Sequence, residues 1–460
     1  MFTAIKKKYI GDKAFYKRYI MLATPMIIQN AITNFVSFLD NIMVGQLGEE
    51  AISAVATVNQ LIFVFYLAVF GAAAAAGIYG AQYFGKKDYK GHMYTFRFKL
   101  YILAIVVILA VSLFMTKGGD LISLFLTDNT GAREKAMALG MDYLGIMVVG
   151  LVPFAINQAY ASTIKETGQT IVPMVAGMIA VGTNAVLDYL LIFGIGPFPE
   201  MGVRGAALAT VIARFIETTV IVAWAHGHRD RNCYLVGAYT GLGLPKEILT
   251  KILVKGTPLM LNEILWAAGM SMVTQCYSVR GMNVLTAVSI SNTVNNLFNI
   301  VFVQLGVCIG IMIGQMLGAG ELEEAKDADN KMIAFSVFCC CIMSLIMFAC
   351  GRLFPQLYNV DADIRRLAAH FISVQAFWMP FAAYTHCAYF TLRSGGKTIV
   401  TFLFDSAFLW VVMAPLAFVL AHFSGLPILT VFFLVQGTEL LKVIVGYFMV
   451  RSNVWVVQMV

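Results

Sequence analysis

The chain has 460 residues, of which 60% are hydrophobic and only 12% are charged, and its mean hydropathy is +0.79. Runs of roughly 18 or more nearly charge-free residues recur along its length, and each can cross about 30 Å of hydrocarbon as a helix. This composition excludes a soluble protein, and the unbroken apolar runs exclude a transmembrane β-barrel, which needs short alternating segments.

The net charge of +7 does not indicate nucleic acid, because Lys and Arg concentrate in alternate loops. An excess of these residues marks the cytoplasmic side of a membrane protein. We therefore predict a multi-pass protein of the plasma membrane, with both termini in the cytoplasm. We expect the protein to be a monomer surrounded by membrane lipids. We expect no nucleic-acid partner.

The apolar runs predict an all-α integral membrane protein with twelve transmembrane helices. The expected spans are 18–44, 52–80, 97–116, 137–163, 171–194, 204–226, 252–279, 284–316, 332–352, 367–391, 398–422 and 427–450.

An internal repeat divides these spans into two halves. The segment ATPMIIQN (23–30) matches GTPLMLNE (256–263), and the same offset of 233 pairs Gln82 with Gln315 and Gly85 with Gly318. Farther along, KETGQTIV (165–172) matches RSGGKTIV (393–400) at an offset of 228. We predict two pseudo-symmetric six-helix bundles: an N-terminal lobe at 1–226, a cytoplasmic linker at 227–251 and a C-terminal lobe at 252–460. Parallel repeats around a midplane site are typical of transporters.

The first span holds an unpaired acid, Asp40, inside the stretch NFVSFLDNIMVGQLG (34–48). An ionisable side chain there costs roughly 3 kcal/mol even on lenient insertion scales, so it marks a functional site. Ser37, Thr33 and Gln29 precede it by three, seven and eleven residues and fall on the same helical face. This polar stripe predicts a helix that lines a water-accessible cavity.

The fifth span adds Asp188, with Asn184 one turn before it on the same face. Two carboxylates in one dry cavity repel each other, so the pair can hold a proton. With amide and hydroxyl neighbours the same oxygens can instead hold Na⁺. The residues leave both ions open, and a purely structural role for the pair is the alternative.

Other acids within spans include Glu217, Glu263, Asp405 and Glu439. Glu217 has Arg214 three residues before it, and Glu439 has Lys442 three residues after it, so both are interpreted as structural ion pairs. Asp405 lies near the start of its span, where it either reaches the interface or takes part in function. Glu263 has no local partner.

A second polar site is expected in the second half. It would contain Glu263 with Asn292, which begins a polar face continued by Asn295 and Asn299. The alternative is that these amides form interhelical hydrogen bonds that hold the bundle together.

These motifs together resemble the multidrug and toxic compound extrusion (MATE) family. The resemblance rests on TPMIIQN and FLDNIMVGQLGEEAISAVATVNQ in the first two spans, NAVLDYLLIFG in the fifth and GVRGAALAT before the sixth. The segment TPLMLNEILWAAGMS in the seventh span repeats the first.

The resemblance implies two six-helix lobes in a V-shape and antiport of cationic organic compounds against H⁺ or Na⁺. Asp40 would be the coupling acid, and Asn184, Asp188 and Thr210 would complete its ion site, which for Na⁺ would include Asp40, Asn184 and Asp188. Bending near Pro25 would be the switch for release. Further residues would line the cavity: Asn34, Tyr143 and Asn157.

The predicted function is therefore secondary active efflux of drug-like, lipophilic cations by alternating access. The chain has no G-x-x-x-x-G-K-[ST] motif, so we expect no ATP coupling and no cofactor besides the coupling ion. One alternative is a flippase or exporter for a lipid-linked or other endogenous metabolite, from the wider MOP superfamily. A membrane-embedded enzyme is disfavoured, because the acids do not cluster at one interface.

Overall fold

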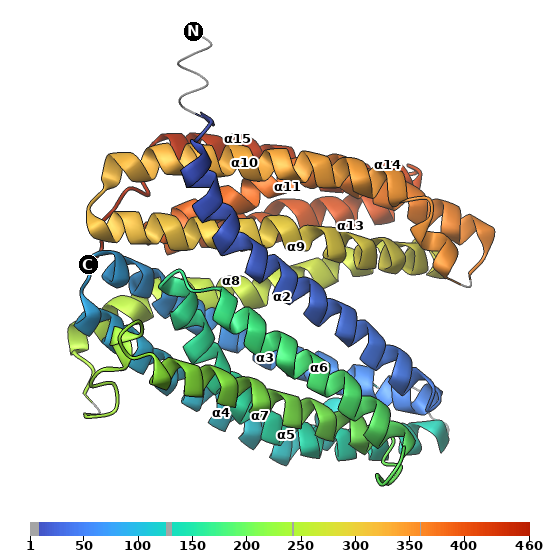
Figure 1. Cartoon of the computed structure of the whole chain (residues 1–460). Helices are drawn as coiled ribbons and strands as arrows, with labels where there is room; N and C mark the ends of the chain where they lie inside the picture. The colour runs from blue at the N-terminus through green and yellow to red at the C-terminus, as the bar shows by residue number, and fades with distance from the viewer. Residues whose placement is uncertain (1–8, 126–130, 242, 359) are drawn as a thin grey trace. The chain divides into compact units, whose positions relative to one another are not determined.

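Helices are the only regular secondary structure in the part of the chain that the computed structural model describes, residues 9–125, 131–241, 243–358 and 360–460 (Figure 1). Apolar sequence of this length forms helices because a helix satisfies all backbone hydrogen bonds within one segment.

The first half contains α2 (Lys13–Gly45), α3 (Glu49–Gly85), α4 (Tyr89–Ser123), α5 (Gly131–Glu166), α6 (Ile171–Phe193), α7 (Val203–Gly227) and η1 (Cys233–Leu235). The second half contains α8 (Lys246–Ser278), α9 (Met282–Ala319), α10 (Leu322–Cys350), η2 (Phe354–Leu357), α11 (Ala362–Ser394), α12 (Thr398–Phe402), η3 (Leu403–Ala407), η4 (Leu409–Met413), α13 (Ala414–Phe423), α14 (Ile428–Gln436) and α15 (Glu439–Arg451).

The predicted all-α fold with twelve long helices is confirmed. The segments α12, η3, η4 and α13 follow one another without a break and count as one, as do α14 and α15 across Gly437–Thr438. Among the described residues, ten of these helices are long and apolar enough to cross a membrane. The other two, α8 and α11, have 33 residues each and are therefore long enough. They are not among these ten because their polar side chains make them less apolar.

The chain forms two compact units, whose boundaries differ from the predicted lobes. Unit 1 contains Met1–Ile27, Ala81–Lys87 and Val254–Val460, and unit 2 contains Ile28–Gly80 and Asp88–Leu253. The lobe limits at 226 and 252 stay a prediction. Helices α2 and α3 each run from one unit into the other.

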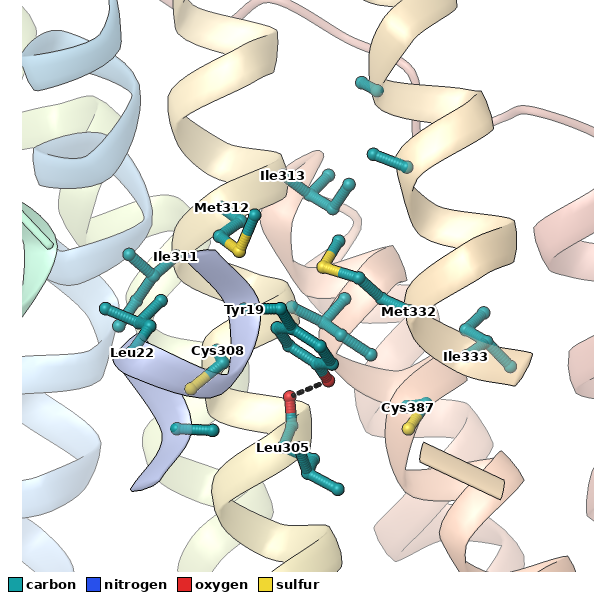
Figure 2. Packing of buried hydrophobic residues seen from close by; sticks show 14 of the residues in the cluster. Tyr19, Leu22, Leu305, Cys308, Ile311, Met312, Ile313, Met332, Ile333 and Cys387 are labelled. Carbon is teal, nitrogen blue, oxygen red and sulfur yellow. Dashed lines mark hydrogen bonds between the residues drawn. The ribbon is translucent and has the colours of Figure 1, made fainter. Parts of the chain in front are cut away.

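The first part of α2 belongs to the core of unit 1. Tyr19 is fully buried beside α9 and α10, and its hydroxyl donates a hydrogen bond to the Leu305 carbonyl at 3.0 Å (Figure 2). The same hydroxyl lies 3.0 Å from Ser336 Oγ. A buried phenol needs such partners, and this pairing explains why residues before Ile27 pack with the second half.

The predicted linker is docked on unit 2. The Arg97 guanidinium of α4 donates hydrogen bonds to the carbonyls of Ala238 at 2.7 Å, Gly243 at 3.0 Å and Gly237 at 2.5 Å. Charged donors make strong hydrogen bonds to carbonyl oxygens. The segment after α7 is therefore held by α4 over part of its length.

Two glycines allow a close helix crossing within unit 1. A Cβ on Gly85 would lie 1.9 Å from the Gln315 carbonyl oxygen, and a Cβ on Gly318 would lie 1.9 Å from the Gln82 carbonyl oxygen. The buried Gln82 side chain donates to the Ser394 carbonyl at 2.9 Å and accepts from the Met459 amide at 2.8 Å. Backbone contact between membrane helices requires small residues of this kind.

We predict that Gly318→Ala lowers the thermal stability of the detergent-purified protein by about 1–3 kcal/mol, because the added methyl group forces the two backbones apart. Gly145→Ala is the matched control, since Gly145 is helical and a Cβ there has no neighbour within 4 Å. The control should keep or raise the unfolding midpoint. An unchanged midpoint for Gly318→Ala would contradict the close crossing.

Candidate functional site

Unit 2 contains a cavity of about 360 Å³ between α2, α3, α5, α6 and α7. Five residues singled out by sequence meet in its lining. They are Asp40, Tyr143, Asn184, Asp188 and Thr210. These five come from four helices and are separated by up to 170 positions in the chain. The structure brings them together, whereas their role in ion binding stays a prediction.

The predicted polar stripe of α2 accounts for one wall. Thr33, Ser37 and Asp40 all line the cavity, as their helical spacing predicts. Gln29, the fourth member, is not part of the lining, and its side chain lies against Gly177 of α6. A Cβ at Gly177 would come within 2.9 Å of Gln29 Nε2, so this glycine allows α2 and α6 to approach each other.

Asp40 and Asp188 face each other within hydrogen-bonding reach. Asp188 is only 1% exposed, and Asp40 is half-buried. Ionised carboxylates can only accept hydrogen bonds. Among the described residues, no donor reaches Asp40 Oδ1 or either Asp188 oxygen. Because orphaned acceptors and adjacent like charges are both costly, this pair favours the uptake of a proton or a cation.

The neighbouring polar groups supply further oxygens. The Asn184 amide donates to Thr210 Oγ1 at 3.5 Å, and the Asn184 side chain lies beside Asp188 in the cavity lining. The Thr210 hydroxyl itself donates to the Ala206 carbonyl of its own helix at 3.0 Å. Carboxylate, amide and hydroxyl oxygens are the ligands that hard cations prefer.

Sequence reasoning missed Asn59 and Tyr66 of α3 as cavity residues. Asn59 Oδ1 accepts a hydrogen bond from the Tyr143 hydroxyl at 3.4 Å. Tyr66 accepts one from Arg214 Nη2 at 3.3 Å. The signal for Asn59 was present, because it is a strongly polar side chain in an apolar span, the argument already applied to Asp40.

Arg214 and Glu217 also line the cavity, and their predicted ion pair is confirmed, with Nη1 and Oε2 3.8 Å apart. The guanidinium carbon lies 4.7 Å from the centre of the Phe154 ring. Stacking and pairing of this kind stabilise a buried guanidinium. Glu217 thus has a counter-ion, unlike Asp40 and Asp188.

Two residues expected at the cavity lie elsewhere. Asn34 is exposed and Asn157 is buried, but neither lines this cavity. Asn34 lies six residues before Asp40 and therefore points to a different face of α2. Pro25 is buried inside α2, in the part that belongs to unit 1.

The residues expected in a second polar site lie in unit 1, where each has partners of its own. Asn292 accepts a hydrogen bond from Gln375 Nε2 of α11 at 3.0 Å, which fits the alternative of an interhelical bond. Glu263 is half-buried and interacts electrostatically with Arg393 and Asp405. Asp405 is bound by Lys442, so it does not reach the interface alone.

Within the described residues, no three His, Cys, Asp or Glu side chains surround a common metal position. A Na⁺ site at Asp40, Asp188 and Asn184 therefore stays a prediction, and such an ion would be exchangeable cargo rather than a resident metal.

Comparison with known proteins identifies the family. The MatE family model matches residues 25–190 and 258–419, which cover both halves of the repeat. The chain belongs to the MATE family of membrane transporters. The resemblance inferred from the sequence motifs is thereby confirmed, and a multi-pass membrane protein is established.

Similar MATE proteins include the probable multidrug resistance protein NorM of Thermotoga maritima, 23% identical over 90% of this chain and 87% of the relative. The probable multidrug resistance protein YoeA of Bacillus subtilis is 22% identical over 89% and 88%. The fold is similar to the bent form of the Vibrio cholerae MATE transporter VcmN, with a TM-score of 0.84 and 18% identity over 97% and 99% of the two chains.

We predict that Asp188→Asn stabilises this MATE protein at alkaline pH by about 1–3 kcal/mol, because it removes one of two facing charges and supplies a donor. The measurement is the thermal unfolding midpoint in detergent across a pH series. Asp142→Asn is the control, since that carboxylate lies 2.9 Å from Arg204 at the surface and should matter little. A lower midpoint for Asp188→Asn at every pH would contradict the unpaired geometry.

Proposed function

We propose that the chain exports drug-like, lipophilic organic cations in exchange for H⁺ or Na⁺. The observation that carries this proposal is the pair of facing carboxyl groups, Asp40 and Asp188, whose inner oxygens have no donor. Relatives along most of the chain are named probable multidrug resistance proteins, which supports efflux as the activity.

The charge of the cavity supports a cationic cargo. Arg214 neutralises Glu217, which leaves the two aspartates as an uncompensated charge of about −2 when both are ionised. The remaining wall includes Phe63, Tyr66 and Met147, which suit apolar parts of varied shape. A lipophilic cation would satisfy both parts of the lining.

Either coupling ion fits the same groups. One proton would turn Asp40 or Asp188 into a donor for the other carboxylate. Na⁺ would instead bind their oxygens together with the Asn184 carbonyl oxygen and the Thr210 hydroxyl. Each ion lowers the negative charge of the pair, so ion uptake would weaken the hold on an organic cation. Competition between the coupling ion and the organic cation for the same negative charge is sufficient to couple their transport in opposite directions.

Alternating access would expose this site to either side of the membrane. Pro25 supports a bend in α2, since proline leaves the carbonyl four residues earlier without its helical hydrogen bond. With the proposed cytoplasmic termini, export would run from the cytoplasm across the plasma membrane, and a monomer would be sufficient for it.

A flippase or exporter for an endogenous anionic lipid is the second candidate. Arg214 in the cavity lining is the observation that favours it. One structural neighbour is described as a MOP superfamily transporter whose reversed pocket polarity suggests a different function. The acids outnumber the bases here, which favours the cation exporter.

The decisive experiment uses everted membrane vesicles, with a fluorescent cation such as ethidium added to the external medium. We expect accumulation driven by a proton or sodium gradient, and its loss in Asp40→Asn. Collapse of ΔpH by nigericin and removal of Na⁺ separate the two ions.

Asp120→Asn is the control for this measurement, because that carboxylate is exposed and pairs only with Lys117 at 3.3 Å. It should transport normally. Full gradient-driven transport by Asp40→Asn would exclude the assigned site, and no cation transport by the wild type would favour the lipid exporter.

For the bend, we predict that Pro25→Ala slows efflux at least several-fold while binding of the cation, measured by quenching of tryptophan fluorescence, is retained. Restoring the helical hydrogen bond stiffens α2 without altering the cavity. Equal transport rates in the variant and the wild type would exclude Pro25 as a hinge.

A further inference from the structure

Unit 1 encloses a charged cluster deep in its helices, around Lys442 of α15. The Lys442 ammonium lies 3.1 Å from Asp405 Oδ1 and 3.7 Å from Glu439 Oε1. These three side chains are 13%, 19% and 16% exposed. A lysine withdrawn from water requires such counter-charges, because removing an ammonium ion from water is unfavourable unless it is paired.

Three of the four carboxylate oxygens in this cluster accept a hydrogen bond, and the fourth lies in an ion pair. Asp405 Oδ2 accepts from the Asn262 amide at 3.1 Å, and Glu439 Oε2 accepts from the Thr385 hydroxyl at 2.9 Å. Lys442 donates to Asp405 Oδ1 at 3.1 Å and forms an ion pair with Glu439 Oε1 at 3.7 Å. The Phe404 ring lies 5.6 Å from the ammonium. Two carboxylates and an aromatic ring are the groups that recognise an organic ammonium ion.

The backbone is shaped to hold Asp405 in this place. Asp405 lies in η3, a π-helical segment, and such segments are frequent at functional sites because they shift the side-chain register. The Asn262 side chain fixes this segment by accepting hydrogen bonds from the Ser406 amide at 3.2 Å and its hydroxyl at 2.7 Å. Asn262 therefore supports both the π-helical turn and the carboxylate.

The internal repeat gives Lys442 a counterpart. Lys442 and Arg214 are 228 residues apart, the offset that pairs 165–172 with 393–400. Arg214 likewise lies against an aromatic ring and beside an acid of its own helix. The halves differ in their remaining acids. Asp405 is paired with the lysine, whereas no Lys or Arg of the described part of the chain pairs with Asp40 or Asp188.

We propose that Asp405, Glu439 and Phe404 form an ammonium-binding site that the protein fills with its own Lys442, and that the site accepts a small primary alkylammonium ion once this side chain is removed. In the native protein the tethered ammonium closes the site to exchange. If the proposed function holds, this confines coupling to unit 2, because no vacant carboxylate pair is left at this position.

The test is chemical rescue of Lys442→Ala, purified as the full chain in detergent. The probe is n-propylammonium, which equals the part of the lysine side chain beyond Cβ. We expect the variant to unfold several degrees below the wild type, and millimolar n-propylammonium chloride to restore much of the loss in a saturable way. Neutral n-propanol should have no such effect.

Lys331→Ala is the matched control, since Lys331 also lies near a carboxylate, Asp327, and 5.9 Å from an aromatic ring, Phe15, but Asp327 is open to water. It should not respond to the amine. The absence of amine-specific stabilisation of Lys442→Ala, or an equal response in the wild type or in Lys331→Ala, would overturn the proposal.

If Lys442→Ala yields no folded protein with or without the amine, the proposal is tested by comparing the unfolding midpoints of Lys442→Arg and Lys442→Met. Both fill the space, but only arginine keeps the cation, so we expect Lys442→Arg to be the more stable. Equal midpoints would overturn the proposal. None of these measurements depends on transport, so loss of efflux in Asp40→Asn and failure of amine rescue are separate results.

Discussion

A carboxylate inside a membrane protein must find a donor, a proton or a cation, because water and counter-ions are absent there. This constraint explains the arrangement of both halves. Lys442 and Arg214 form ion pairs with acids near them, and an amide and a hydroxyl group donate to the second oxygens of Asp405 and Glu439. Asp40 and Asp188 differ in that two carboxyl groups face each other, and no described donor reaches their inner oxygens. Such a pair is costly unless it takes up a proton or a cation.

Much of this could be predicted from the sequence, because the cost of a charge in hydrocarbon is visible without coordinates. The apolar runs predict the helices, and the single-face spacing of Thr33, Ser37 and Asp40 predicts their shared position at the cavity. The pairing of Asp188 with Asp40 was predicted because both are acids without a local counter-ion in the same half. Helical periodicity by itself describes one element at a time.

Other long-range pairing was beyond sequence reasoning for the same reason. Lys442 was expected to neutralise Glu439 three residues away, and it does, but it lies closer to Asp405 on another element. Likewise, Asn157 shares a helix with Tyr143, yet only Tyr143 lines the cavity. The packing of Tyr19 with the second half has no periodic signal either, because it depends on which surface the first turns of α2 meet.

The close helix crossing at Gly85 and Gly318 reflects the internal repeat. Gly85 meets Gln315 while Gly318 meets Gln82, and the repeat makes Gly85 equivalent to Gly318 and Gln82 to Gln315. In a two-fold interface between identical subunits, contacts are reciprocal: where residue i of one copy contacts residue j of the other, residue j of the first copy also contacts residue i of the second. The crossing thus has, within one chain, the reciprocal contacts that a two-fold interface between two copies of the repeat would have.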